Sequence, residues 1–123
     1  MVGDKAYGLD SEKLAVGHLR KKGYKILERN YRTRLGEIDI IARHKDVLVF
    51  VEVKARRSLR YGHPKLAVTP AKQRTLSRVA LAYLKDNGGL NTRARFDVVT
   101  VLNLDDRAQI EIFPNAFELA GMD

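Results

Sequence analysis

The segment that most constrains the fold is Val47 to Val51, an unbroken apolar run. Successive side chains of a β-strand point to opposite faces, so a strand without polar alternation must be covered on both sides. The run is far too short to span a bilayer as a helix. It therefore predicts the central strand of a layered α/β domain, with helices on both faces of the sheet.

The flanking residues predict the order αβββαβ. A first helix is expected to be capped by Asp10 or Ser11 and to end at Gly23. A second begins with Thr69 as N-cap and Pro70 as first helical residue, and Asn87-Gly88-Gly89 stops it. Strands are expected at Tyr24–Arg34, Glu37–Arg43, Val47–Ala55 and Phe96–Leu102, with Gln109–Phe113 as a candidate short fifth strand. The pattern indicates a mixed sheet flanked by helices, in a single domain over residues 1–123.

The chain is strongly basic, with 23 lysines and arginines against 15 acids and a net charge of +8. A basic surface attracts phosphate backbones because binding releases condensed counterions, although anionic membranes or ribosomal RNA would satisfy the same charge. Residues 1–10 contain no apolar run of the length that a secretory signal needs. The absence of cysteine excludes disulfides and a cysteine nucleophile and fits a reducing compartment. We expect a cytoplasmic protein without a membrane segment.

Two charged residues, Glu52 and Lys54, interrupt the apolar central strand and share one of its faces. A two-residue turn at Lys45-Asp46 would place Asp39 opposite Glu52, and Glu37 opposite Lys54. Two facing carboxylates repel each other unless a proton or a cation lies between them. An oxygen-seeking cation such as Mg²⁺ or Mn²⁺ resolves the conflict.

Spacing alone leaves two interpretations of these four charged residues. One is a metal site built on the facing carboxylates. The other is a structural ion-pair network with solvent on that face of the sheet. A one-residue slip in register would separate Asp39 from Glu52, so both interpretations depend on the turn.

The stretch Gly36-Glu37-Ile38-Asp39 through Val51-Glu52-Val53-Lys54 resembles the Asp-x(n)-Glu-x-Lys core of the PD-(D/E)XK nuclease superfamily. More closely, the chain resembles the YraN-like family of predicted endonucleases, which is related to archaeal Holliday-junction resolvases. The similarity continues through Gly23-Tyr24, Arg29-Asn30-Tyr31-Arg32, Val68-Thr69-Pro70, Lys72-Gln73, Arg95-Phe96-Asp97-Val98-Val99 and Asn115-Ala116-Phe117. Ser11 departs from the glycine expected in relatives at that position.

This resemblance implies a restriction-endonuclease-like core and a metal-dependent endonuclease that hydrolyses phosphodiester bonds in DNA, with branched DNA as a candidate substrate. The alternative is a nuclease-fold module that binds nucleic acid without cutting it. The resemblance favours DNA over RNA as the partner, and it implies a homodimer by analogy alone.

In the site that the resemblance implies, Asp39 and Glu52 would bind Mg²⁺ or Mn²⁺ together with the backbone carbonyl of Val53. Lys54 would orient the attacking water or stabilise charge on the phosphoryl oxygens. Glu12 would reach the site from the first helix as a further catalytic ligand. Its alternative role is that of a carboxylate favoured by the positive end of the helix dipole.

Basic and polar residues after the site predict a surface for phosphate: Arg56, Arg57, Arg60, Lys72, Gln73 and Arg74. The alternatives are a solvated loop for the arginines and a plain helix-end role for Gln73. Glu37 is expected to pair with Lys54 or a nearby arginine, and Asp97 to cap the start of a strand. His18, His44 and His63 show no metal-ligand spacing and are expected to be ordinary surface or loop residues.

Overall fold

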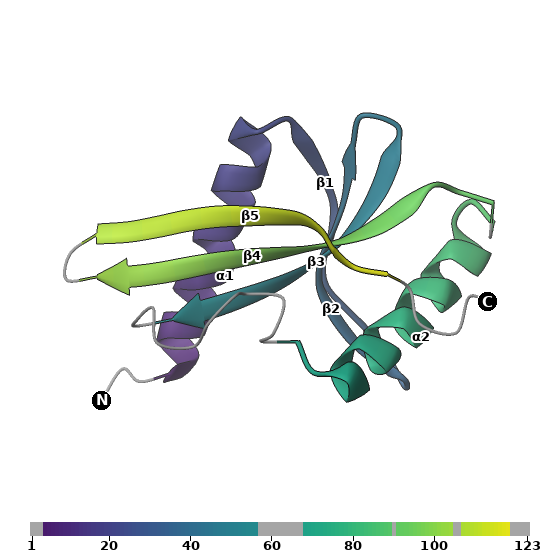
Figure 1. The fold of residues 1–123 in the computed structure, drawn as a ribbon, viewed down its shortest axis with the longest axis horizontal. Helices are drawn as coiled ribbons and strands as arrows, with labels where there is room; N and C mark the ends of the chain where they lie inside the picture. The colour runs from purple at the N-terminus through teal and green to yellow at the C-terminus, as the bar shows by residue number, and fades with distance from the viewer. Residues whose placement is uncertain (1–3, 57–67, 90, 105–106, 119–123) are drawn as a thin grey trace.

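The computed structural model describes residues 4–56, 68–89, 91–104 and 107–118. Its elements are α1 (Asp4–Lys21), β1 (Tyr24–Thr33), β2 (Gly36–His44), β3 (Val47–Arg56), α2 (Pro70–Asp86), β4 (Ala94–Leu104) and β5 (Arg107–Phe117). The strands form one sheet in the order β1-β2-β3-β4-β5 (Figure 1). Sequence neighbours are therefore spatial neighbours throughout the sheet.

The sheet is mixed, as predicted. β3 and β4 are parallel, whereas the other neighbouring pairs are antiparallel. Parallel neighbours need a crossover connection, and α2 lies in the segment that joins β3 to β4. The predicted element order needs one correction: the candidate strand at Gln109–Phe113 is the long strand β5, so the order is αβββαββ.

α2 begins and ends where the sequence predicts. The Thr69 hydroxyl accepts a hydrogen bond from the backbone N–H of Lys72 at 3.1 Å, and Pro70 occupies the first helical position. Past the end of the helix, the backbone N–H of Gly89 donates to the carbonyl of Leu84. No helix within the described residues has the length and apolar content needed to cross a bilayer.

The predicted start of α1 is wrong, because the helix begins at Asp4 rather than at a cap formed by Asp10 or Ser11. Ser11 lies inside the helix and is 1% exposed, so its small side chain is part of the packed interface instead of a cap. The helix ends at Lys21, and Gly23 follows with a φ of 91°, as a glycine C-terminal stop requires.

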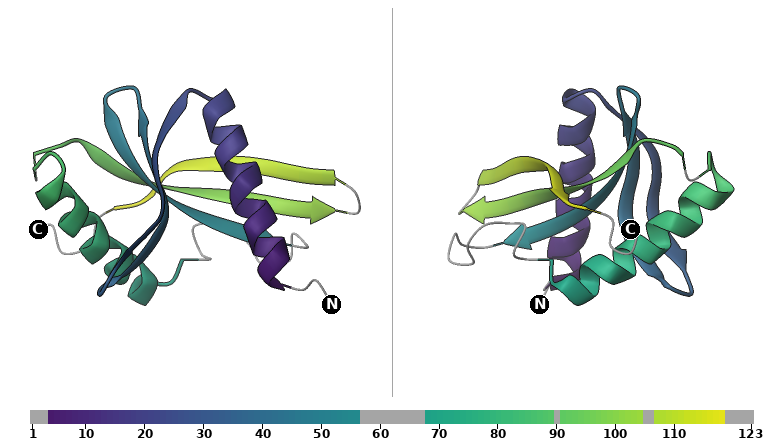
Figure 2. Two further views of the ribbon diagram at one scale, coloured as in Figure 1. Left: turned by 180° about the vertical axis from the view of Figure 1, so that it is seen from behind. Right: turned by 45° about the vertical axis from the view of Figure 1, so that its right-hand side comes forward.

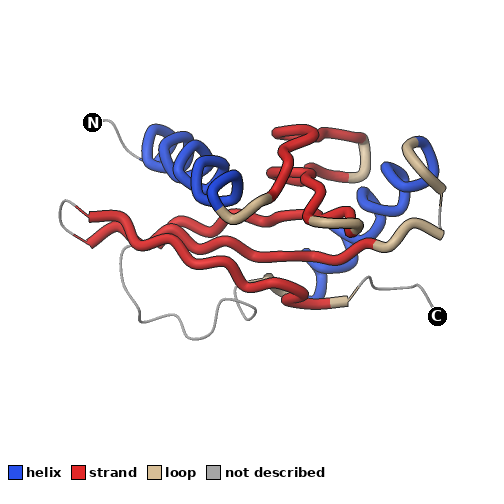
Figure 3. The backbone as a smooth tube through the Cα atoms, turned by 90° about the horizontal axis from the view of Figure 1, so that it is seen from above, coloured by secondary structure: helices blue, strands red, loops and turns tan. Residues whose placement is uncertain are grey.

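β3 is covered on both faces, which confirms the first prediction. Leu48 and Phe50 pack in the cluster that includes the buried face of α2, whereas Val49 and Val51 pack in the cluster that includes α1. The view from behind shows α1 crossing one face of the sheet (Figure 2, left). Seen from above, α2 lies at the other end of the sheet (Figure 3). The two helices thus pack in separate core clusters, one on each face of β3.

Candidate metal and nucleic-acid site

The β2–β3 hairpin has the predicted register. Pairing begins at His44 and Val47, on either side of the tight turn, and continues to Ile40 and Val51. Regular antiparallel pairing ends at that pair, so Asp39 and Glu52 are the first residues beyond it. The candidate site therefore lies where two neighbouring strands stop pairing with each other.

The irregularity of β2 is also visible in its packing. Ile38 and Ile41 belong to the same buried cluster although they are three residues apart, whereas regular alternation would send them to opposite faces. Ile40 packs in the cluster on the α1 side. The strand therefore turns about its own axis near Asp39, which lies between these two patterns.

Asp39 joins the two strands through its side chain. Its Oδ2 accepts a hydrogen bond from the backbone N–H of Val53 at 2.8 Å. In an unbroken ladder a backbone carbonyl would accept from this N–H group, and here a carboxylate oxygen replaces it. The same carboxylate lies within hydrogen-bonding reach of Glu52, as predicted from the turn.

Glu52 is 6% exposed and carries an unusual proton affinity. Burial, followed by the hydrogen bond with Asp39 and the charge of Asp39, raises the pKa of its carboxyl group to about 8. Lys54 and Lys72 act in the opposite direction, with ammonium nitrogens 3.9 Å and 3.8 Å from Oε2 of Glu52. Without a metal ion, a shared proton and two ammonium groups relieve the repulsion between the carboxylates.

Lys72 was predicted as a phosphate contact, but its ammonium group reaches the carboxylate pair. Glu52 shares a strand face with Leu48 and Phe50, and α2 packs in the cluster that covers this face. The first turn of α2 therefore approaches Glu52 from outside the sheet. The alternation of side chains along β3 could have predicted this contact, because it places Glu52 on the sheet face that one helix must cover.

Glu12 approaches from α1. It is partly buried, and its pKa is raised by burial first and then by the charge of Asp39, while Arg29 acts to lower it. With its side-chain nitrogen turned toward the acids, Asn30 donates to Glu12 Oε1 at 2.9 Å and to Glu37 Oε1 at 3.2 Å. Asn30 has a φ of 54° inside a strand, a conformation that asparagine tolerates better than most residues. Sequence reasoning did not identify this contact.

The other predicted residues have separate locations. Glu37 pairs with Arg32 of the neighbouring strand, with 3.3 Å between Oε2 and Nε, so the arginine alternative is confirmed. Gln73 uses its side-chain nitrogen to donate to the carbonyl of Val68 at 2.9 Å, at the start of α2. Arg74 is exposed on the same helix turn and Arg56 ends β3, whereas Arg57, Arg60 and His63 lie outside the described residues.

We call the place where β2 and β3 stop pairing, with Asp39, Glu52 and Val53, the fork. The groups that could bind a metal ion there are oxygens. Within the described part of the chain, no group of three or more histidine, aspartate or glutamate side chains could by itself hold a metal ion. Asp39 and Glu52 nevertheless bring carboxylate oxygens together, and oxygen ligands suit Mg²⁺ or Mn²⁺. A divalent cation there needs further ligands, for which water, Glu12 and the carbonyl of Val53 are the candidates.

A second polar cluster surrounds Asp97, which is fully buried. Its carboxylate accepts from the Tyr24 hydroxyl at 2.8 Å, from Nε of Arg95 at 2.9 Å and from the backbone N–H of Asn115 at 3.0 Å. The β4–β5 register shifts between Phe96 and Val98, so this carboxylate also receives an N–H group at a break in pairing. The prediction that Asp97 caps a strand start is therefore wrong.

His44 belongs to the same cluster and is not an ordinary loop residue. Its ring stacks on Tyr24 with centroids 4.2 Å apart and an angle of 11° between the planes. Its Nδ1 lies 3.1 Å from Nη2 of Arg95. No local pattern predicts this cluster, because Tyr24 and Asp97 are 73 residues apart.

The fold and the fork together define a small α/β protein with a mixed five-stranded sheet and an acidic pair where β2 and β3 stop pairing. The chain belongs to the family described as "Uncharacterised protein family UPF0102", whose profile matches residues 11–101. The resemblance to the YraN-like group is thereby confirmed.

Relatives match over most of their length. A UPF0102 protein of Desulfosudis oleivorans is 54% identical over 91% of this chain and 89% of its own. One from Geobacter sulfurreducens is 51% identical over 95% of this chain and 92% of its own. Among solved structures, Pyrococcus furiosus SfsA in complex with Ca²⁺ aligns with a TM-score of 0.42 and 14% identity, over 89% of this chain and 63% of that one.

Proposed function

We propose that the protein is a metal-dependent nuclease that hydrolyses phosphodiester bonds in nucleic acid, with DNA favoured over RNA. The observation that carries the proposal is the contact between the carboxyl groups of Asp39 and Glu52 at the end of the β2–β3 pairing. Burying Glu52 beside the carboxyl group of Asp39 is costly unless a proton or a cation lies between them. A divalent cation bound between the two carboxylates would balance their negative charge.

The residues of the chain have distinct roles in this proposal. Asp39 and Glu52 hold Mg²⁺ or Mn²⁺, with the Val53 carbonyl as a backbone ligand and Glu12 as a further acid. When bound, the metal supplies Lewis acidity at the scissile phosphate and lowers the pKa of a water molecule. Lys54 and Lys72 are near Glu52 before a metal binds, and both ammonium groups are placed to stabilise negative charge on a phosphate.

Nucleic acid is the partner that the charge of the chain favours. The net charge is +8, and the ammonium groups of Lys54 and Lys72 lie beside Glu52. Arg56, Arg57 and Arg60 follow β3 in the sequence and are proposed to contact phosphates. The second candidate function, binding without cleavage, uses the same basic residues and differs only in having no reaction at the carboxylate pair.

A cleavage panel separates the two candidates. Single-stranded, duplex, flap and four-way DNA are incubated with the protein and Mg²⁺, Mn²⁺ or chelator, and products are resolved on denaturing gels. The nuclease proposal predicts metal-dependent cleavage of at least one structure, with cleavage abolished by Glu52→Gln. DNA binding without cleavage of any DNA or RNA structure in either metal would leave the binding module as the function.

A further inference from the structure

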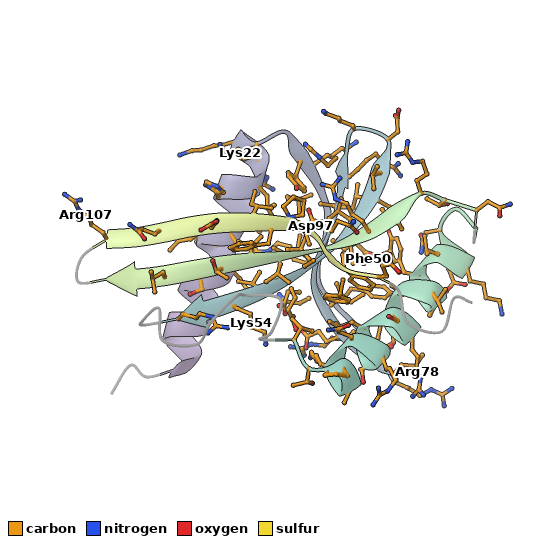
Figure 4. All side chains as sticks on the ribbon, in the orientation of Figure 1. Lys22, Phe50, Lys54, Arg78, Asp97 and Arg107 are labelled. Atoms are coloured by element: carbon orange, nitrogen blue, oxygen red, sulfur yellow. The ribbon has the colours of Figure 1, made fainter. Side chains whose placement is uncertain are left out.

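A pocket of about 510 Å³ lies beside the Asp97 cluster, away from the carboxylate pair. Its lining comes from the end of α1 (His18 and Lys22), from the stacked rings of Tyr24 and His44, and from β5. Figure 4 shows Lys22 at one end of α1 and Lys54 near the other, so the pocket and the fork are separate places on the molecule. A pocket of this volume accommodates a ligand of nucleotide size.

The walls of the pocket suit a flat ring. Ile110, Ile112 and Pro114 of β5 supply an apolar wall. The half-buried ring of His44, which stacks on the buried ring of Tyr24, supplies aromatic surface. Stacking on aromatic side chains is the usual way in which proteins hold an unpaired base, because every base has a π-face.

The aromatic wall is held in one orientation by the cluster behind it. The Tyr24 hydroxyl donates to Asp97 and accepts from Nη2 of Arg95 at 3.0 Å. Burial, followed by the hydrogen bond with Asp97, raises the pKa of Tyr24 to about 12, so the hydroxyl stays protonated. Strands β1, β2 and β4 each contribute to this wall, which limits the reorganisation needed when a ligand binds.

His44 is also fixed in its proton position. A guanidinium group can only donate hydrogen bonds, so Nδ1 of His44 must accept from Nη2 of Arg95. A neutral imidazole then carries its proton on Nε2. Within the described residues no hydrogen bond to this Nε2–H group is recorded, which leaves it as a donor for a ring nitrogen or a carbonyl oxygen of a ligand.

Charges of opposite sign lie on different walls. Lys22 is an exposed cation on the α1 wall, and Glu111 is an exposed acid on the β5 wall. Burial lowers the pKa of His18, and the charges of Lys22 and Lys21 lower it further, so the surroundings disfavour its cationic form. An anionic group is therefore favoured at Lys22, whereas amino or ring N–H groups are favoured at Glu111.

We propose that this pocket binds a nucleotide: the planar base lies against the His44 ring, which the buried Tyr24 ring supports, and the phosphate contacts Lys22. The ligand has two sources with the same chemistry, a free mononucleotide or an unpaired nucleotide of a nucleic-acid strand. The proposal does not depend on the metal site, because no lining residue belongs to the fork.

The test uses 2-aminopurine, a fluorescent base that is quenched on stacking, in the full-length protein with chelator present. One probe is the 2-aminopurine mononucleotide, and the other is a DNA duplex that contains a single unpaired 2-aminopurine. Saturable quenching is expected with at least one probe. Quenching by the mononucleotide assigns a free nucleotide, and quenching by the bulged duplex alone assigns a strand.

Lys21 provides a matched control, because it is an exposed neighbour of Lys22 that does not line the pocket. Lys22→Ser should weaken binding by roughly tenfold, as expected for the loss of a charged hydrogen-bond donor, while Lys21→Ser leaves it nearly unchanged. His44→Phe keeps an aromatic ring, removes the Nε2–H donor and should also weaken binding. Thermal melts confirm that each variant folds.

The outcomes are distinguishable from those of the nuclease test. Glu52→Gln removes an acid of the fork and should leave quenching of the mononucleotide probe as in wild type, whether or not the protein cuts DNA. The absence of saturable quenching with both probes at millimolar concentration would overturn the pocket proposal. Equal weakening by Lys21→Ser and Lys22→Ser would overturn it too, since that result indicates a general effect of charge.

Discussion

The backbone N–H of Val53 donates to the carboxylate of Asp39 at 2.8 Å, where β2 and β3 cease to pair. This hydrogen bond holds Asp39 beside Glu52 without an intact ladder. Both carboxyl groups are thereby fixed before any cation arrives. The acidic pair can be understood as a consequence of how the hairpin opens, and several measurable properties depend on it.

The stability of the metal-free protein should depend on the protonation of Glu52. The pKa of Glu52 is about 8 in the folded chain against an ordinary value of 4.5. Between pH 4.5 and pH 8 the folded state therefore keeps a proton on Glu52 that the unfolded state has lost. This contribution is fully present below pH 4.5 and is lost as the pH rises through 8. The free energy of unfolding should therefore fall over this range, by at most about 1.4 kcal/mol per pH unit from this group.

Urea unfolding in chelator at several pH values measures the effect, and Glu52→Gln is the control. The difference between wild type and variant isolates Glu52 from groups such as His18, whose lowered pKa acts in the opposite direction. Parallel pH profiles for the two proteins would show that Glu52 does not hold a proton at neutral pH.

The Asp97 cluster should be important for folding. Asp97→Ala would leave Arg95 and Tyr24 without their buried acceptor, at a cost of about 3–5 kcal/mol. Asp86→Ala is a suitable comparison, because that acid is exposed at the end of α2 and its loss should change stability by less than about 0.5 kcal/mol. Chemical denaturation of the three proteins measures both values, and similar midpoints would contradict the role assigned to Asp97.

Much of the sheet was predictable because local signals agreed with the tertiary structure. The apolar run at Val47–Val51 predicted a strand covered on both faces, and the turn at Lys45-Asp46 predicted the register. The Thr69-Pro70 start of α2 was equally clear. In these segments hydrophobic period, capping and turn chemistry all indicate the same structure.

The remaining features depend on contacts between distant segments. Local capping preference suggested a helix start at Asp10 or Ser11, but α1 begins at Asp4 and buries Ser11 in its interior. The hydrogen bond from Tyr24 to Asp97 spans 73 residues, and no local pattern announces it. The approach of Lys72 to Glu52 likewise depends on where α2 crosses the sheet.

Binding to DNA should be driven by phosphate contacts and should therefore weaken linearly with the logarithm of salt concentration. Each lost contact should reduce the slope by about 0.9. Neutralising Arg57 and Arg60 together is expected to flatten the slope, while Arg107→Ala leaves it unchanged. Figure 4 places Arg107 at the far tip of the β4–β5 hairpin, away from Lys54. Fluorescence anisotropy over a salt series measures the slope, and an affinity independent of salt would contradict a backbone-driven interface.

The carboxylate pair can be tested as a cation site with a single conservative change. Asp39→Asn keeps an oxygen that can accept from the N–H group of Val53, but removes the negative charge of Asp39 beside Glu52. In chelator the variant should therefore be as stable as wild type or more stable. It should lose the metal response, because a metal stabilises only the folded state that binds it.

Thermal melts of wild type and Asp39→Asn, each in chelator and in Mn²⁺, test the central claim most directly. The metal-site proposal predicts that Mn²⁺ raises the melting temperature of wild type, and that it leaves the melting temperature of Asp39→Asn unchanged. A structural ion-pair network predicts the reverse: Asp39→Asn lowers the melting temperature in chelator, and Mn²⁺ changes neither protein. That second pattern would contradict the assignment of Asp39 and Glu52 as metal ligands.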